Sequence, residues 1–511
     1  MKDKFNRSVF IWSIVFSAFA HAFRWFNTSF CHDSLIVYQN DGIWQLFIGR
    51  WLVPFWLLVR GTVASPWLIS ILSVLFLSLA IVLLVNLIGI RRLSLALPVS
   101  AVLASCPVVT CLFAGFISAT DLHTLSFLLS ILSVFILARV KKGVVPAAVL
   151  LALSMALYQT YLEVALVLVI FLLIRQLVQE ESLTAVKRFV VRSFCYFALG
   201  GSLYIVIWLV SIWMLGYSPA TLPTAGDYND LGTLSGLLKN NVWNLGVGAY
   251  KSAADYIMFP ETKSSGIIGA LNLLLCLLAI VRIAFSAKEW NRRLICLGLV
   301  AILPLAANFV FILSGGTAHT LMVMSLVMLY AGVVMTSAFH LNGVNPRIDR
   351  ITRISILAVT ALVAFNFTVF ANQTHLRVNL EEQSTLSAIT RVLDRVENSG
   401  EFTPGGKVVL VGALNTSPIF KTRDGFESTR RRHTPLRSNF SVTYLESYQN
   451  YFNNILSYPV VIAGRDETMA FSNMPEVIQM PSFPAPGCVR KVGDALVVKL
   501  SDIQSQNYAS D

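Results

Sequence analysis

Eleven apolar runs in this chain are long enough to cross a membrane, and they constrain the fold more than any other feature. A hydrocarbon core about 30 Å thick needs roughly 20 apolar residues in a helix. Hydrophobic residues make up 56% of the sequence and charged residues only 13%, which excludes a soluble enzyme, a disordered chain and a secreted disulfide scaffold. The runs lie near residues 8–26, 66–89, 94–114, 122–138, 144–159, 161–179, 193–216, 265–286, 294–313, 320–338 and 354–371. We therefore predict an α-helical polytopic membrane protein with about 11 transmembrane helices.

Lysine and arginine are distributed unevenly between the two alternating sets of loops. One set holds 19 basic residues, whereas the other short loops hold only Arg50, Arg60, Lys239, Lys251 and Lys263. Because basic loops remain in the cytoplasm, the N-terminus is predicted to be cytoplasmic. An odd number of spans then places the C-terminal end of the chain outside. Sidedness and membrane lipids account for the basic excess, so no nucleic-acid partner is predicted.

The charge balance also separates two domains. Residues 1–371 carry the whole net charge of +12, whereas residues 372–511 hold 14 basic and 14 acidic residues. Within this tail, Leu386, Ile389, Leu393 and Val396 recur at helical spacing, and Gly400 can end that helix. The strand-like runs are Lys407–Ala413, Pro459–Ala463 and Ala495–Leu500. We predict a transmembrane domain over 1–371 and an external α/β domain over 372–511.

The first external loop, residues 27–65, is unlike an ordinary connector. Its stretch Asn40–Ala64 is rich in aromatic residues, Trp44 among them, but is interrupted by glycine, proline and arginine. This pattern is typical of one or two helices lying in the membrane interface. Such helices either form a groove for a lipid-linked substrate or simply anchor the loop.

Polar residues in this loop could perform chemistry. Asp33 is placed to act as a general base beside the groove, or alternatively to cap the following helix. Arg50 can bind a phosphate by paired hydrogen bonds, or alternatively extend to the lipid headgroups. His32 and Asp41 are weaker candidates of the same kind.

Further candidates lie at the outer ends of later spans. Asp121 and His123 begin the fourth run, where Asp121 either caps the helix or lines the site. Tyr158, Gln159 and Glu163 lie at a tight turn between two runs, where a glutamine often makes a helix–helix hydrogen bond instead. The sequence has no HExxH, zinc-ligand spacing, GxSxG or DxD motif. We therefore expect no cofactor, and a divalent metal is left open.

These residues together resemble a known family. The chain is similar to the serotype-converting O-antigen glucosyltransferases of enteric bacteria and their phages, which are multispanning enzymes of the GT-C architecture. The resemblance covers roughly residues 1–180. It rests on His32-Asp33-Ser34-Leu35, Gly49-Arg50-Trp51-Leu52, Asp121 and Tyr158-Gln159, which occur in matching order. Where the family often has two adjacent acids, this chain has Asp33-Ser34, so we favour Asp33 as the base and keep Asp41 as the alternative.

The resemblance implies a reaction and a location. It implies transfer of glucose from undecaprenyl-phosphate glucose to a sugar of the lipid-linked O-antigen repeat, at the periplasmic face of the bacterial inner membrane. A donor synthase and a small flippase are the implied pathway partners. A sugar phosphate already has a good leaving group, so one base and one cation suffice and direct displacement would invert the anomeric centre.

Other functions are compatible with the same composition. The first alternative is another GT-C glycosyltransferase or an O-antigen polymerase. The second is a transporter or a flippase for lipid-linked sugars, although the paired halves and interrupted mid-membrane helices of transporters are not visible. A third alternative is a scaffold that uses the tail to bind glycan.

Overall fold

The structure is a computed structural model. It describes residues 2–27, 29–30, 33–36, 42–222, 242–259, 265–316, 318–417, 419–420, 425–426, 440–442 and 445–502. Contacts divide the chain into two compact units. The first contains residues 1–25, 40–113 and 119–372, and the second contains residues 26–39, 114–118 and 373–511.

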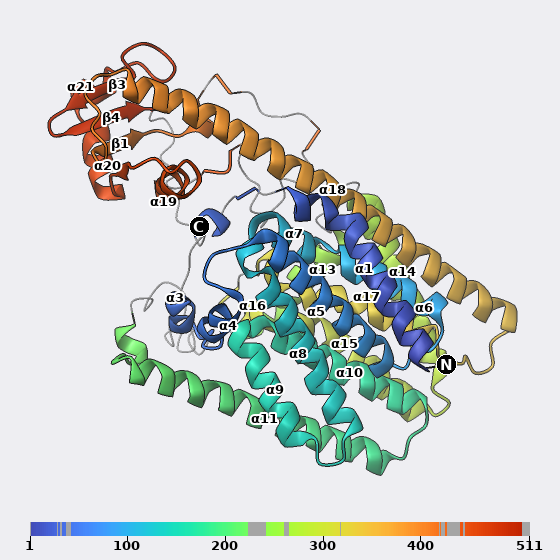
Figure 1. Ribbon diagram of the computed structural model, residues 1–511. Coiled ribbons are helices and arrows are strands. Elements are labelled where there is room, and N and C mark those ends of the chain that lie inside the picture. Colours follow the sequence, from blue (N-terminus) through green and yellow to red (C-terminus); the bar gives the residue numbers. More distant parts are fainter. Residues whose placement is uncertain are drawn as a thin grey trace. The chain divides into compact units, whose positions relative to one another are not determined.

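The first unit consists mainly of helices joined by short loops and turns over its described residues (Figure 1). Its helices α8 and α9 pack closely together, α8 also packs on α5, and α9 also packs on α11. The α-helices that precede residue 158 are α1 (Lys2–Phe26), α3 (Ile43–Phe47), α4 (Val53–Arg60), α5 (Pro66–Leu87), α6 (Leu93–Ser105), α7 (Pro107–Gly115), α8 (Thr120–Arg139) and α9 (Val144–Leu157). The later ones are α10 (Leu162–Val178), α11 (Leu183–Met214), α13 (Val242–Met258), α14 (Ser265–Ser286), α15 (Trp290–Ala307), α16 (Phe309–Leu313), α17 (Met324–Thr336) and α18 (Pro346–Glu397).

Every predicted apolar run coincides with helical structure. Within the described residues, nine helices are long and apolar enough to cross a membrane by length and composition. The runs near 144–159 and 320–338 correspond to the shorter apolar helices Val144–Leu157 and Met324–Thr336. The chain is therefore a polytopic helical membrane protein, and the total of eleven crossings remains a prediction.

One predicted span is interrupted where the chain reaches a proline. The run near 94–114 divides into α6 and α7 because Pro107 forces Cys106 into an extended conformation. Two buried side chains of α1 bind backbone carbonyls near the ends of α6 and α7. His21 donates from Nε2 to the carbonyl of Ala104 at 2.9 Å, and Arg24 donates from Nε to the carbonyl of Phe113 at 2.9 Å.

Loop one contains three short helices within its described residues, and the last two lie in the stretch where one or two helices are predicted; their position in the membrane interface stays a prediction. The helix α2 (Asp33–Ile36) belongs to the second unit, whereas α3 and α4 belong to the first. The helix α4 is apolar on both sides but only partly buried. Val53 and Leu57 pack inward, while Leu58 and Val59 are 79% and 80% exposed. A fully exposed apolar face on a short helix fits a position against lipid.

The helix α18 is continuous across the predicted domain boundary (Figure 1). It runs for 52 residues, through the predicted span 354–371 and on through the predicted tail helix that ends near Gly400. The helix continues past residue 372 because, after its first residue, this stretch contains neither glycine nor proline that would end a helix.

The second unit contains a small four-stranded sheet, three strands of which fall within the predicted strand-like runs. Its strands β1 (Lys407–Val411), β2 (Val461–Ile462), β3 (Val489–Val492) and β4 (Ala495–Lys499) have the order β2-β1-β4-β3. The strand β1 runs parallel to β2 and β4, whereas the unpredicted strand β3 pairs antiparallel to β4. The other helices of the tail are α19 (Leu445–Asn450), α20 (Arg465–Ser472) and α21 (Pro475–Ile478), with a π-helical turn over Tyr451–Ile455.

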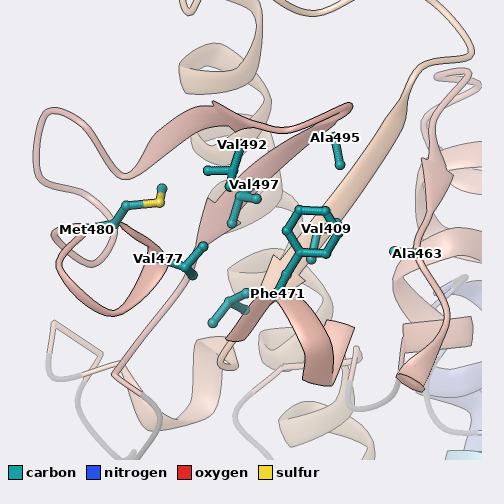
Figure 2. Close-up of a cluster of buried hydrophobic side chains, with 9 residues drawn as sticks. Val409, Ala463, Phe471, Val477, Met480, Val492, Ala495 and Val497 are labelled. Carbon is teal, nitrogen blue, oxygen red and sulfur yellow. The ribbon is translucent and has the colours of Figure 1, made fainter. Parts of the chain in front are cut away.

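A hydrophobic cluster joins the sheet to α20 and α21. Alternate residues of the central strands, Val409 and Val497 among them, are directed toward Phe471 of α20 (Figure 2). All five residues of β4 are buried, which is typical of a strand covered on both faces. The cluster comprises Val409, Val411, Ala463, Phe471, Val477, Met480, Val492, Ala495 and Val497.

We expect Phe471→Ala to destabilise the second unit by about 3 kcal/mol, because it removes a buried aromatic ring and leaves a cavity. Limited proteolysis of the full-length protein should show faster cleavage within residues 400–502. The control is Ile478→Ala, since Ile478 on the neighbouring helix is 55% exposed. Equal cleavage rates for the two variants would contradict the assigned core.

Candidate functional site

The favoured base lies at the start of a short helix. Asp33 is the first residue of α2, which agrees with a helix start at this position. The side chain of Asp33 lies outside the described part of the structure, as do His32 and Asp41. Their roles as base, phosphate ligand and alternative base therefore stay predictions.

Arg50 lies between α3 and α4 and is held by two neighbours. Its Nη1 donates to Oε1 of Gln45 at 2.7 Å. Its guanidinium also lies over the ring of Tyr158, 4.5 Å from the ring centroid, in a cation–π arrangement. The half-buried cation is thus held in one orientation on an aromatic platform, as recognition of an anionic group requires.

His123 belongs to the same cluster. Its ring lies 4.1 Å from that of Tyr158 and 6.0 Å from that of Tyr161. Its Nδ1 is buried and has no hydrogen-bond partner among the residues that the structure describes. A buried polar atom without a partner is unfavourable and often marks a position that a ligand or water completes. Arg50, His123 and Tyr158 therefore form one cluster, which we call the arginine cluster.

Gln159 attaches the end of α3 to the transmembrane helices. Its Nε2 donates to the carbonyl of Ile48 at 2.7 Å and to the hydroxyl of Tyr204 at 3.1 Å. The neighbouring Gly49 has a φ of +86°, and an added Cβ would lie 2.4 Å from the Tyr204 hydroxyl oxygen. Trp208 donates from Nε1 to the carbonyl of Leu46 at 3.1 Å. The end of α3 is thus held against α11, and the close approach of Tyr204 and Gln159 leaves no room for a side chain at residue 49.

Asp121 is completely buried and is bound from two sides by α4. Trp56 donates from Nε1 to Oδ2 at 2.7 Å, and Nη1 of Arg60 lies 3.3 Å from Oδ1. Burial lowers the pKa of the Arg60 guanidinium from its usual range, and the Asp121 carboxylate opposes that shift. Beside this polar contact, Leu122 and Leu157 pack on the buried residues Val53 and Leu57. Asp121 therefore attaches the interface helix to the start of α8.

Glu163 is buried at a different place. Its Oε1 accepts the backbone N–H of Val310, at the start of α16, and its Oε2 accepts the hydroxyl of Ser325 at 2.9 Å. Asn308, at the break between α15 and α16, donates from its side chain to the carbonyl of Ala249 at 3.0 Å. Glu163 thus stabilises a helix break and, although one helical turn from Gln159, contacts different elements.

Trp44 lies on α3 and is 44% exposed. An exposed tryptophan on an interface helix fits either proposed role, a wall of a lipid groove or an anchor. Among the described residues, no group of three or more His, Cys, Asp or Glu side chains is placed to hold a metal ion.

Sequence reasoning missed the partners of the predicted residues. Trp56, Arg60 and Tyr204 had no assigned role, although each contacts a predicted site residue. One signal was present: a carboxylate among apolar residues needs a counter-charge. The set of short loops that is poor in lysine and arginine offers few cations, Arg50 and Arg60 among them, but sequence alone could not assign Asp121 to Arg60.

Comparison with known proteins gives one match. A family model described as Glucosyl transferase GtrII matches residues 22–336. This range includes the arginine cluster, Asp33, Asp121 and Glu163, and ends before α18. Neither the curated proteins nor the solved structures contain a significant match.

We expect Gly49→Ala to destabilise the protein more than Gly216→Ala. The two glycines have similar positive φ, +86° and +82°, but a Cβ at Gly216 meets nothing within 4 Å, whereas one at Gly49 meets Tyr204 and Gln159. Gly216→Ala therefore measures the backbone strain alone, about 1 kcal/mol. Thermal unfolding in detergent should show the larger loss for Gly49→Ala and partial recovery in Gly49→Ala/Tyr204→Phe. Equal losses for the two glycines would argue against the close approach.

We expect Asp121→Asn to destabilise the protein by about 3 kcal/mol, because it removes the negative partner of a buried arginine. Arg60→Met should cost a similar amount. A double-mutant cycle measured by unfolding in detergent should show that the double variant loses much less than the sum of the two. Strict additivity would show that the two charges do not interact.

Proposed function

The chain belongs to the GtrII family of glucosyl transferases, and on this premise we propose how it carries out the transfer of glucose in O-antigen modification. The proposed donor is undecaprenyl-phosphate glucose, and the proposed acceptor is a sugar of the lipid-linked O-antigen repeat. We place the reaction at the periplasmic face of the bacterial inner membrane, with the N-terminus cytoplasmic. The family match over residues 22–336 is the observation that carries the proposal.

The distribution of charges supports this location. The arginine cluster and loop one lie in the set of loops that is poor in lysine and arginine, which the positive-inside rule assigns to the outside. A nucleotide-sugar donor would be found on the other side, whereas a lipid-phosphate sugar can be presented at either surface.

The chemistry needs one base and one cation. In the proposed step Asp33 accepts the proton of an acceptor hydroxyl while that oxygen attacks the anomeric carbon of glucose. The bond between the anomeric carbon and the phosphate oxygen breaks, and undecaprenyl phosphate leaves with the electron pair. A single displacement inverts the anomeric centre, so a β-linked donor gives an α-glucoside. Asp41 is the alternative base.

Arg50 is proposed to bind the phosphate of the donor. The guanidinium is already oriented by Gln45 and Tyr158, so binding requires little reorganisation. Phosphate gains negative charge as the bond to glucose breaks, and a fixed cation stabilises that charge more in the transition state than in the ground state. His123 and His32 are proposed to support the same group, and Tyr158, Gln159, Asp121 and Glu163 to shape the surrounding site.

The exposed apolar face of α4 supports a lipid-linked substrate. Phe55, Leu58 and Val59 on this face are 60%, 79% and 80% exposed, and the helix is fixed by Asp121 at its end. Together with Trp44, this face offers a surface along which a polyprenyl chain can lie. The family match favours glucosyl transfer over the polymerase and flippase alternatives, and the donor synthase and small flippase remain proposed pathway partners.

We expect Asp33→Asn to lower the rate of glucosyl transfer at least about a hundredfold, because the amide cannot accept the proton. The assay is transfer from synthetic undecaprenyl-phosphate glucose to lipid-linked O-antigen by the purified protein. Asp255→Asn serves as the control, since Asp255 is exposed on α13. If Asp33→Asn were fully active and Asp41→Asn were inactive, Asp41 and not Asp33 would be the base.

We expect Arg50→Ala to lower kcat roughly a hundredfold, by loss of charge stabilisation on the leaving phosphate. Arg50→Lys should lower it less, because lysine keeps the charge but not the planar, paired donors. Gln45→Ala is the matched control, since it removes the partner of Arg50 and leaves the cation in place. If Gln45→Ala and Arg50→Ala had equal effects, Arg50 would act through local structure and not through the phosphate.

A further inference from the structure

The helix that carries the proposed base cannot be stable by itself. The helix α2 has only four residues, whereas isolated helices need about 12–15 residues to persist in water. Its conformation must therefore come from its neighbours. Two segments that contact it, residues 114–118 and the helix α19, belong like α2 to the second unit, which also contains the C-terminal sheet.

Ser34, the residue after the proposed base, fixes α2 from one side. Its hydroxyl donates to the carbonyl of Gly115 at 2.8 Å and accepts the backbone N–H of Ile117 at 3.1 Å. Ser34 is completely buried, and Leu35 is 1% exposed. One small side chain thus occupies both a donor and an acceptor of the segment 114–118, which in turn packs through Ala114 on Val378 of α18.

The C-terminal helix α19 contacts α2 and is itself attached to the sheet. Gln449 of α19 donates from Nε2 to the carbonyl of Val460 at 2.6 Å and accepts at Oε1 the backbone N–H of Ile462 at 2.6 Å. Its amide therefore pairs with the backbone around β2 as another strand would. Tyr448 accepts the backbone N–H of Leu414, just beyond β1, at 3.4 Å.

We propose that the C-terminal domain positions the proposed base for proton transfer. It holds α2 between two contacts: the hydrogen bonds of Ser34 to residues 114–118, and the helix α19, which is attached to the sheet. Ser34 and Gln449 are positioning residues, since they act through Asp33. This inference rests on the proposed function of Asp33. It gives residues 373–502 a task in the reaction that lies outside the matched family region.

The first experiment measures the positioning without measuring activity. Hydrogen exchange, followed by mass spectrometry on the full-length protein in detergent, reports the opening of α2. Ser34→Ala removes two hydrogen bonds and should speed exchange in residues 33–36 about tenfold. Gln449→Ala should speed exchange there too, while exchange in β1 and β4 shows whether the sheet remains folded.

Two matched controls complete this experiment. Ser73→Ala removes a buried serine hydroxyl that bonds only to Ile69 within its own helix α5. Lys407→Ala removes an exposed ion pair with Glu467 at the sheet. Neither should alter exchange in residues 33–36. Unchanged exchange in Ser34→Ala, or an equal change in the controls, would overturn the proposal.

The second experiment separates this inference from the proposed function. Ser34→Ala should lower kcat about tenfold and leave the KM for the lipid-linked donor unchanged, because the base is misplaced while donor binding is intact. In the Asp33→Asn background, Ser34→Ala should have no further effect on the residual rate. If Asp33→Asn is fully active, the assignment of the base fails. If Asp33→Asn is impaired but Ser34→Ala lowers the rate equally in both backgrounds, the positioning role fails.

Discussion

A backbone carbonyl that ends a membrane-spanning helix needs a hydrogen-bond donor, because hydrocarbon supplies none. In this protein, arginine side chains supply many of these donors. Examples among the described residues, each at the C-terminal end of another helix, are Arg175 to Leu87, Arg192 to Leu137 and Val140, Arg282 to Thr336 and Phe339, and Arg292 to Leu177 and Glu181. A cation at this end also stabilises the helix dipole. The residues from which the sequence indicates sidedness therefore also complete the ends of the spans.

The same constraint explains the polar residues at the other ends of the spans. Where α6 gives way to α7, His21 donates to the carbonyl of Ala104, and Arg24 donates to the carbonyl of Phe113 near the end of α7. Where α15 gives way to α16, Glu163 accepts an N–H that the new helix cannot satisfy internally. In the sequence alone, each of these ionisable residues could be taken for a catalytic group, because a charged side chain at membrane depth is energetically costly and is a functional candidate by default. The structure supplies a different reason, which is the hydrogen bonding of interrupted backbone.

The sequence predicted those features that depend on local pattern. The apolar runs, the turn at Tyr158, the interface helices and the three main strands all follow from periodicity within short windows. The continuity of α18 was missed because a change in polarity at residue 372 marks a change of surroundings, not the end of a helix. The strand β3, Val-Arg-Lys-Val, is only four residues long and gains its stability from pairing with β4. The pairing of Asp121 with Arg60 and the fit of Gly49 against Tyr204 depend on contacts between distant segments, which a single sequence does not encode in readable form.

The contacts of the buried acids bear on which carboxylate transfers a proton. Of the four carboxylates that the sequence offers as site residues, Asp121 accepts from Trp56 at one oxygen and pairs with Arg60 at the other. Glu163 likewise has a donor at each oxygen, from Val310 and Ser325. A carboxylate whose two oxygens are both engaged by protein donors must break a buried contact before it can bind a substrate hydroxyl, and that cost raises the barrier. The bonds that Asp121 and Glu163 already make therefore argue against either of them as the base, and they support the proposal that places the base among the loop-one acids, Asp33 or Asp41.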